Sequence, residues 1–304
     1  MYQTKYIYLF LLIIFFSWSC QKENAVPVAN AGASQTITLP INSVTVNGIG
    51  ADADGQVVGY LWSKLSGPAS PTIVNPASAA TVISGLSQGS YVFQFMVTDN
   101  KGATGVDTMS VQVNPSPIQT TTFQPSNNPF EWTMWLTNGV EQDATNRPDI
   151  PIEAWTVNSN PTYAREVIKF DLSSIPASAS IQSATLYLYS YPSPTQNGNL
   201  VDANSGTNNT MLIQQVSSNW NSSSINFNLT ATTANQVIVP STTQSILDLN
   251  VDVTALVSSM VNTNSNYGFL LKLQNETIYN IRNFVSSYNT THTTKYPKLV
   301  VTYQ

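Results

Sequence analysis

Three tyrosines, Tyr187, Tyr189 and Tyr191, recur at every second position of one stretch, and Leu186 and Leu188 alternate with them. Successive side chains of a β-strand point to opposite faces, so leucines that face a core would place the tyrosines on the outer face. Flat aromatic rings cover the C–H faces of sugars and supply contact area with little loss of side-chain entropy. The stripe therefore predicts a carbohydrate-binding platform, unless a further layer or loop of the protein covers it.

Tryptophans are the second group of candidate ligand contacts. Trp155 and Trp220 are predicted to contact a glycan, and Trp132 and Trp135 lie in the same half of the chain. The alternative for each of them is burial in a core, which is where most of the surface of a tryptophan usually lies.

Cations are needed if the glycan carries carboxylates. Lys272 and Arg282 are the predicted contacts, because a guanidinium bonds a carboxylate through two parallel N–H groups. Arg282 has a second interpretation, which is an ion pair with Glu276. A surface ladder of ion pairs is predicted for three charges that share one strand face: Arg165, Lys169 and Asp171.

Acidic residues at alternate positions point to calcium. Asp248 and Asp252 flank Asn250 in a strand-like run, and hard oxygen ligands suit Ca²⁺. A structural calcium site is therefore predicted there, although Asp252 has an alternative role as a cap of a helix that begins near Thr254. A second candidate set lies in a loop-like region: Glu141, Asp143, Asp149 and Glu153. The Asp-Ala-Asp-Gly sequence at 52–55 lacks the further ligands of a calcium loop and predicts a turn.

The composition excludes several classes of function. Only 9% of the 304 residues are charged, and 16 acidic residues exceed 11 basic ones, so the chain has no basic field for nucleic acid. One cysteine and one histidine cannot build a Cys/His zinc site or an internal disulfide.

The residue types offer little support for catalysis. His292 is the only imidazole, and no Gly-x-Ser-x-Gly motif accompanies it. Tyr288, His292 and Arg282 match the residue types of jelly-roll polysaccharide lyases, but the strand motifs of those enzymes are absent. Paired carboxylates for glycoside hydrolysis remain open. We predict no catalytic residue.

Residues 1–19 have the features of an export signal. Lys5 precedes an uninterrupted apolar run from Tyr6 to Phe16, which is shorter than the ~20 residues that span a bilayer. The sequence Ser-Trp-Ser-Cys at 17–20 resembles the looser lipoprotein boxes of Bacteroidota. The resemblance implies cleavage before Cys20, acylation of its sulfur and anchoring at the outer membrane or cell surface, with 20–25 as a tether. An ordinary cleaved signal is the alternative.

Residues 26–115 are expected to form an Ig-sized β-sandwich, because short alternating runs are separated by Gly, Pro and Asn/Asp breakers. The runs Ala29–Gly32, Tyr60–Trp62 and Val97–Thr104 resemble a polycystic-kidney-disease (PKD) domain, which is an Ig-like module. The Trp-Asp-Phe-Gly-Asp-Gly hallmark of that family is replaced by Trp-Ser-Lys-Leu-Ser-Gly-Pro at 62–68. Trp62 is predicted to be a core residue. Residues 116–122, rich in Pro and Thr, are predicted to be a linker.

Residues 123–304 are expected to form a larger β-sandwich with one short helix, whose apolar stripe is Leu256, Val257, Met260 and Val261. In order along the chain, the segments 164–176, 181–189, 252–257, 267–269 and 296–303 resemble the DNRLRE domain family. That resemblance implies a jelly-roll-like carbohydrate-binding module, with alginate-type polysaccharide among the ligands of its members. Family members often carry a tryptophan where Ser224–Asn228 stands here, and Phe227 would have to replace it as a ligand contact.

Together these features predict an all-β surface lipoprotein, with an Ig-like sandwich followed by a jelly-roll-like one, that binds polysaccharide without catalysis. Its expected partners are a glycan, the membrane through its lipid anchor, and neighbouring glycan-degrading or transport proteins. A structural or adhesive surface protein without specific glycan binding is the alternative, and a weak polysaccharide lyase or hydrolase is the third hypothesis.

Overall fold

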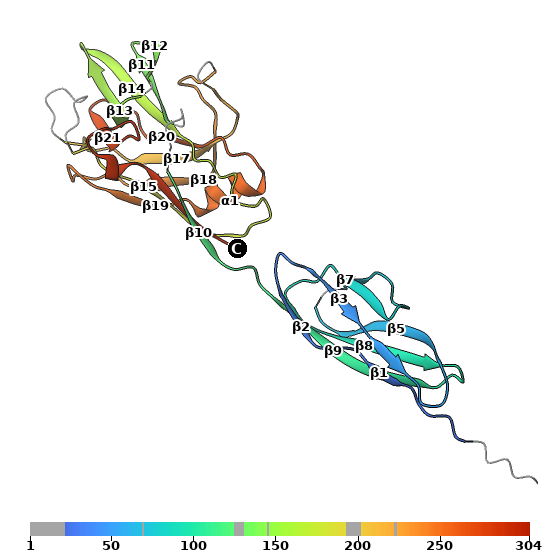
Figure 1. Cartoon of the computed structure of the whole chain (residues 1–304). Helices are drawn as coiled ribbons and strands as arrows, with labels where there is room; N and C mark the ends of the chain where they lie inside the picture. The colour runs from blue at the N-terminus through green and yellow to red at the C-terminus, as the bar shows by residue number, and fades with distance from the viewer. Residues whose placement is uncertain (1–21, 69, 125–130, 145, 193–201, 222–223) are drawn as a thin grey trace, which may run out of the picture. The chain divides into compact units, whose positions relative to one another are not determined.

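The computed structural model describes residues 22–68, 70–124, 131–144, 146–192, 202–221 and 224–304. It divides into two compact units, Met1–Ser116 and Pro117–Gln304 (Figure 1). The predicted export signal and Cys20 lie outside the described residues. No helix in the described part of the chain is long and apolar enough to cross a membrane.

The N-terminal unit is an Ig-like β-sandwich, as predicted. Its strands are β1 (Val28–Asn30), β2 (Gln35–Thr38), β3 (Ser43–Asn47), β4 (Ile49–Ala51), β5 (Val57–Ser66), β6 (Thr72–Ile73), β7 (Ala80–Ser84), β8 (Gly89–Asp99) and β9 (Thr104–Asn114). One sheet has the order β2-β9-β8-β5, with β2 parallel to β9, and a second has the order β3-β7-β6. A short antiparallel pair, β1 and β4, completes the unit.

The core of this unit follows from the period-2 pattern of β8. Phe93 and Phe95 are completely buried, and Trp62 of β5 is 1% exposed with its ring 4.7 Å from that of Phe95. The indole N–H of Trp62 donates to the carbonyl of Ala79 at 3.1 Å, which satisfies its one donor inside the sandwich. Trp62 is therefore the core residue that the sequence predicts.

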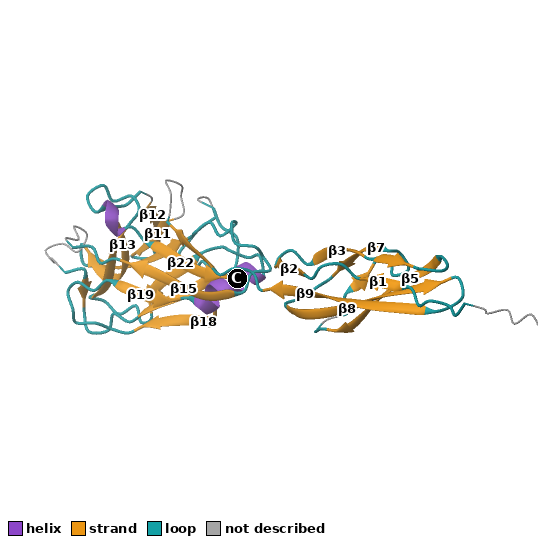
Figure 2. Ribbon diagram, turned by 60° about the horizontal axis from the view of Figure 1, so that its bottom comes forward, coloured by secondary structure: helices purple, strands orange, loops and turns teal. Residues whose placement is uncertain are grey.

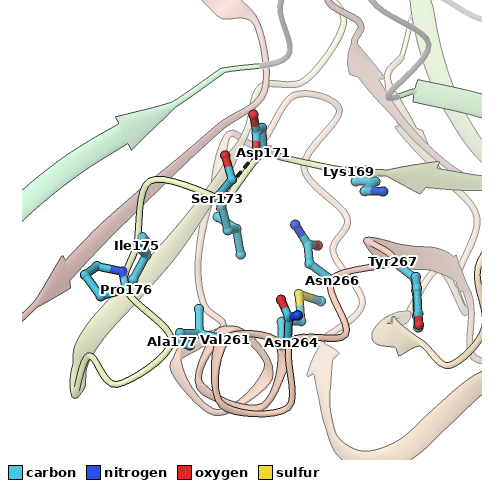
Figure 3. A pocket seen from close by; sticks show the side chains of 12 residues that line it. Lys169, Asp171, Ser173, Ile175, Pro176, Ala177, Val261, Asn264, Asn266 and Tyr267 are labelled. Atoms are coloured by element: carbon cyan, nitrogen blue, oxygen red, sulfur yellow. Dashed lines mark hydrogen bonds between the residues drawn. The ribbon is translucent and has the colours of Figure 1, made fainter.

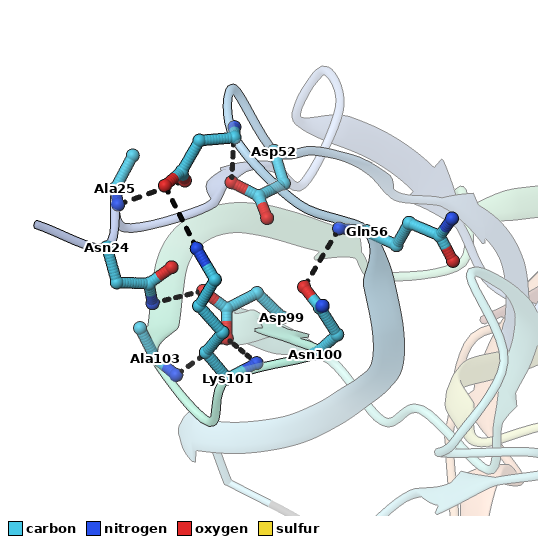
Figure 4. A network of polar contacts seen from close by, with 9 residues as sticks. Asn24, Ala25, Asp52, Gln56, Asp99, Asn100, Lys101 and Ala103 are labelled. Atoms are coloured by element: carbon cyan, nitrogen blue, oxygen red, sulfur yellow. Dashed lines mark hydrogen bonds and ion pairs between the residues drawn. The ribbon is translucent and has the colours of Figure 1, made fainter. Parts of the chain in front are cut away.

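Carboxylates tie the turns together at one end of this unit (Figure 4). The buried carboxylate of Asp99 accepts hydrogen bonds from the side-chain amide of Asn24 and from the backbone N–H groups of Lys101 and Ala103. Lys101 Nζ lies 3.1 Å from Asp54 Oδ2, and the N–H of Asp54 points to Asp52 Oδ1 at 3.4 Å. The 52–55 segment is thus the turn that its sequence predicts, and a lysine neutralises it.

In the described part of the C-terminal unit, the strands form two sheets and the chain has one α-helix, α1 (Figure 2). Its elements are β10 (Gln119–Phe123), β11 (Glu131–Thr137), β12 (Val140–Ala144), β13 (Asp149–Val157), β14 (Asn160–Ile168), β15 (Ile181–Leu188), β16 (Asn204–Ser205), β17 (Met211–Val216), β18 (Ala231–Val239), β19 (Leu249–Asp252), α1 (Thr254–Asn262), β20 (Phe269–Leu273), β21 (Asn280–Val285), the 3₁₀ turn η1 (Thr293–Lys295) and β22 (Lys298–Tyr303). A four-stranded sheet has the order β10-β22-β15-β19. The larger sheet has the order β16-β21-β13-β14-β20-β17-β18, with β11 and β12 continuing from β14.

The main core of this unit lies between the two sheets. The four-stranded sheet contributes Leu186 and Leu299, and the larger sheet contributes Phe269 and Leu271, all at most 1% exposed. Because Leu186 faces this core, its neighbours in β15 face the other side of the four-stranded sheet. The expected sandwich with one short helix is confirmed.

The predicted linker, 116–122, is corrected by the structure. Most of it belongs to β10, which pairs antiparallel with β22 along Gln119–Phe123. The run Thr120–Thr122 consists of β-branched residues, which fit a pleated sheet edge. The two units divide at Ser116–Pro117, before this strand.

The helix α1 has the predicted apolar stripe, and Leu256, Val257, Met260 and Val261 are all buried. Its N-cap position is Val253, no side chain caps it through a hydrogen bond, and Thr254 is already helical. Asp252 Oδ1 accepts hydrogen bonds from the N–H and the hydroxyl of Thr254 at 2.9 and 2.6 Å. These bonds hold the pKa of Asp252 below its usual value.

Candidate functional site

The tyrosines lie on the outer face of the four-stranded sheet. Leu186 and Leu188 are completely buried, whereas Tyr187, Tyr189 and Tyr191 are half-buried. The sequence-based choice of faces is therefore right. The exposed Asn250 of β19 is paired with Tyr187, so this face of the sheet carries a polar residue beside the tyrosines.

A lysine sits on this stripe. Lys298 of β22 is paired with Tyr187 on the opposite side from Asn250. Its Nζ lies 4.6 Å from the ring centroid of Tyr187 and 5.9 Å from that of Tyr189, both within the range of cation–π attraction. Among the described residues Lys298 forms no ion pair. The ammonium therefore remains available to an added anion.

The stripe continues past the end of β15. The rings of Tyr191 and His292 meet edge to face, with centroids 5.7 Å apart. Lys295 of η1 lies 3.8 Å from Asp248 beside them, in a pair that water reaches. We call the surface formed by Tyr187, Tyr189, Tyr191, Asn250, His292 and Lys298 the tyrosine face. It combines aromatic rings, an amide and one free cation, the groups that contact the C–H faces, hydroxyls and carboxylates of a glycan.

Arg282 does not belong to a surface site, which corrects the sequence prediction. It is completely buried in β21, and its guanidinium donates to the backbone carbonyls of Asn209 and Pro240. Burial lowers the pKa of Arg282 to about 10. Its second interpretation, a pair with Glu276, is also wrong, because Glu276 accepts from Arg165.

Trp220 and Phe227 have structural roles. The indole N–H of Trp220 donates to the carbonyl of Tyr267 at 2.7 Å, and the ring packs against a small second core. Phe227 is 5% exposed within that core, so it cannot replace a ligand-contacting tryptophan of the DNRLRE family. The predicted ion-pair ladder on one strand face is also wrong, because Arg165 pairs with Glu276, and Lys169 and Asp171 lie beyond the end of β14.

Trp155 and Lys272 lie in the larger sheet, away from the strands that carry the tyrosine face. Trp155 is half-buried at the end of β13 and meets Tyr279 edge to face at 5.3 Å. Tyr279 is 58% exposed and has a φ of 72°. Lys272 is half-buried in β20, opposite Leu212 of β17. The structure therefore does not bring these predicted contacts together with the tyrosines.

Asp248 and Asp252 do not fit a shared calcium ion. They are four residues apart in an extended segment, which separates their Cα atoms by roughly 13 Å, whereas Ca²⁺–oxygen distances are about 2.4 Å. Asp248 instead accepts from the backbone N–H of Ser190 at 2.9 Å, and Asp252 accepts from Thr254. Among the described residues, no group of three His, Cys, Asp or Glu side chains is arranged to hold a metal ion.

Four buried carboxyl groups gather on the larger sheet. The sequence placed Asp149 and Glu153 in a loop, but both lie in β13, and the structure adds Glu131 of β11 and Glu166 of β14. Thr133 donates to Glu166, Ser286 to Glu131 and Asn283 to Asp149. Glu131, Asp149 and Glu166 line a cavity of only about 10 Å³, too small for a sugar ring.

Burial governs the protonation of this cluster. It raises the pKa of Glu153 to about 8, against the opposing effect of Arg147, and it raises the pKa of Glu166 well above 4.5. Burial also raises the pKa of Glu131. Arg147 itself bonds Asp149 at 2.9 Å and lies 4.9 Å from the ring centroid of Trp135. Burial therefore favours the neutral, protonated form of Glu131, Glu153 and Glu166.

A larger cavity, of about 480 Å³, lies where the segment after β14 meets the end of α1 (Figure 3). Sequence reasoning missed it, because its walls come from segments about ninety positions apart. It also missed Lys298, whose place beside Tyr187 depends on the register of β15 and β22. The sequence indicates only that Lys298 points away from the core, because it alternates with Leu299 and Val301 of the last strand.

Comparison with known protein families agrees with this two-unit architecture. Residues 31–113 match the family model described as K319L-like, PKD domain. Residues 153–303 match the model of carbohydrate-binding module family 96. The chain thus contains a PKD-like domain followed by a carbohydrate-binding module domain.

Individual relatives cover only parts of the chain or resemble it weakly. The human dyslexia-associated protein KIAA0319 is 35% identical over 100 residues, which are 32% of this chain and 9% of that protein. The solved PKD domain of human KIAA0319 is 26% identical, with a TM-score of 0.29, and covers 36% of this chain and 96% of its own. A solved carbohydrate-binding module of the β-sandwich superfamily is 11% identical, with a TM-score of 0.25, over 93% of this chain and 92% of its own. This chain spans 9% of the length of human KIAA0319 and 20% of that of the mouse low-density lipoprotein receptor-related protein 11.

Proposed function

We propose that the C-terminal unit binds polysaccharide without catalysis, and that the tyrosine face is its contact surface. The observation that carries the proposal is the position of Lys298 over the rings of Tyr187 and Tyr189, on the outer side of a sheet. The match of residues 153–303 to a carbohydrate-binding module family supports the same ligand class.

The open tyrosine face favours contact along the side of a polysaccharide chain. A strand-borne row of rings is flat, so it stacks against several sugar units in succession and does not enclose one. Asn250 supplies an amide for hydroxyl groups beside the rings.

The charge of the face favours glycans that carry carboxylates, such as alginate-like polymers. Lys298 has no carboxylate partner among the described residues, and Asp248 is paired with Lys295. An approaching uronate would gain a charge-assisted hydrogen bond from Lys298 without breaking an existing ion pair.

Affinity electrophoresis of the mature chain in gels that contain alginate, pectin, chitin or xylan tests this proposal. We expect retardation in alginate or pectin, and its loss in Tyr187→Ala and in Lys298→Ala. Tyr279→Ala is the matched control, because it removes an exposed tyrosine of the same unit that lies just before β21 of the other sheet. Folded protein that migrates freely in all four gels would leave the structural or adhesive hypothesis in its place.

We further propose that the mature chain is a lipoprotein anchored through Cys20, with the PKD-like unit as a spacer and with glycan-degrading or transport proteins as neighbours. The support is the apolar run up to Phe16 followed by the only cysteine of the chain. Expression in a bacterium with labelled palmitate, followed by membrane fractionation, tests it. Cys20→Ser should abolish labelling and release the protein, and an unlabelled soluble wild-type protein would contradict the anchor.

A further inference from the structure

The 480 Å³ cavity of the C-terminal unit has the size of a small-ligand site and is separate from the tyrosine face. The segment 169–177, which follows β14, forms one side, and the end of α1 with residues 264–267 forms the other (Figure 3). None of its lining residues belongs to the tyrosine face.

The cavity has one apolar and one polar side. Its apolar lining consists of Leu172, Ile175, Pro176, Ala177, Met260 and Val261. Several of these side chains also pack into the main core, and Met260 is 1% exposed. The apolar side is therefore held by the fold before any ligand arrives.

The polar side carries groups that the protein leaves without partners. Among the described residues, Lys169 and the side-chain amide of Asn264 form no hydrogen bond or ion pair. Asn266 uses its Nδ2 to donate to the carbonyl of Phe170 at 2.6 Å, which leaves its Oδ1 open. Asp171 is already engaged, because it accepts hydrogen bonds from the N–H of Ser173 at 2.9 Å and from the side chain of Ser173.

The loop after α1 fixes the direction of Asn264. The N–H of Asn264 donates to Val261 and that of Ser265 to Met260, which closes the end of the helix. Asn264 has a φ of 50°, a left-handed conformation that asparagine tolerates better than most residues. This backbone geometry places Asn264 in the lining of the cavity.

The polar groups of the cavity favour a ligand with several hydroxyl groups over a ligand with one charged group. Lys169 and Asp171 both line the cavity with opposite charges, and Lys169 helps to lower the pKa of Asp171 although no ion pair joins the two side chains. Neighbouring hydroxyls of a sugar ring can donate to a carboxylate and accept from an ammonium or amide at once, with charge-assisted strength. The C–H face of the same ring would pack on the apolar side.

We propose that this cavity binds the terminal one or two residues of a neutral saccharide chain. A hollow between two segments admits the end of a chain, whereas the tyrosine face contacts its side. The inference shares the ligand class of the proposed function, but it depends on different residues, and the two fail separately.

Isothermal titration of the mature chain with cellotriose, xylotriose, laminaritriose and chitotriose tests the proposal. We expect at least one of these neutral trisaccharides to bind in the millimolar range or tighter. Lys169→Met and Asn264→Gly should each weaken binding about tenfold, which corresponds to one charge-assisted or neutral hydrogen bond. Asn264→Gly keeps the left-handed backbone and removes only the side chain.

The controls separate this cavity from the tyrosine face. Tyr187→Ala should leave trisaccharide binding unchanged while it reduces retardation by polymers. Loss of trisaccharide binding in Tyr187→Ala but not in Lys169→Met would overturn the inference, as would the absence of binding to all four trisaccharides. Binding of octanoate, a small amphipathic anion, in place of the sugars would also overturn it.

Discussion

The guanidinium of Arg165 lies on the ring of Phe227, with Cζ 3.9 Å from the ring centroid. The same guanidinium donates to the backbone carbonyl of Phe227 at 2.7 Å and grips both carboxylate oxygens of Glu276, at 2.7 and 2.9 Å. One side chain of β14 thus joins two loops that precede β18 and β21 in the chain.

Replacing Arg165 by lysine should destabilise the C-terminal unit by about 1–2 kcal/mol. Lysine keeps the charge, but it cannot reproduce the two-pronged contact with Glu276 and the stacking on Phe227. Urea unfolding followed by circular dichroism measures the change. Lys272→Arg, at a half-buried site without an ion pair among the described residues, should stay within about 0.5 kcal/mol of wild type. Equal stability of Arg165→Lys and wild type would show that the paired hydrogen bonds to Glu276 and the stacking on Phe227 add nothing to the free energy of unfolding.

The buried carboxyl cluster predicts that the C-terminal unit loses stability as pH rises. Glu153 has a folded pKa of about 8 against an ordinary value of 4.5, because burial disfavours its charged form. The folded state therefore keeps a proton that the unfolded state releases, and this stabilisation is present below pH 4.5 and is lost as pH approaches 8. The buried Glu131 and Glu166 act in the same direction.

Thermal melts of wild type and of Glu153→Gln between pH 5 and pH 8 measure this effect. The midpoint of the wild type should fall across the range, and Glu153→Gln, a neutral residue of the same shape, should fall less steeply. A wild-type midpoint that rises from pH 5 to pH 8 in parallel with that of the variant would contradict the assignment.

The features that sequence predicted well are those set by local periodicity. The alternation of Leu186 and Tyr187 identifies which face is buried, and the spacing of Leu256 and Met260 identifies the inner side of α1. Both follow from the geometry of a single element, without knowledge of its neighbours.

The features that sequence missed depend on register between distant strands. Lys298 meets Tyr187 only because β22 pairs with β15, and Arg165 finds Glu276 across loops. Burial of charge is also hard to predict, since a lone arginine such as Arg282 is by default assigned to the surface. In this fold, the backbone carbonyls of Asn209 and Pro240 accept hydrogen bonds from the buried guanidinium of Arg282.

Trp62 provides a test of the difference between core and ligand-binding tryptophans. Trp62→Ala should cost the N-terminal unit about 3–5 kcal/mol, because it leaves a large cavity beside Phe95 and removes the donor to the carbonyl of Ala79. Chemical unfolding measures the loss, and gel retardation by polysaccharide should be unchanged under conditions where the variant is folded. A variant of normal stability and reduced retardation would instead make Trp62 a ligand contact.

Lys298→Met should weaken binding of alginate roughly five- to tenfold at low ionic strength, which corresponds to about 1–1.4 kcal/mol. The methionine keeps a long side chain over Tyr187 but removes the ammonium that faces the proposed uronate. Because salt screens exposed charges, wild-type binding should weaken between 20 mM and 500 mM NaCl, whereas the variant should be nearly insensitive to salt. Lys272→Met removes a cation from the other sheet and should behave as wild type. Equal salt dependence in Lys298→Met and wild type would show that the tyrosine face recognises glycans through its rings and amide alone.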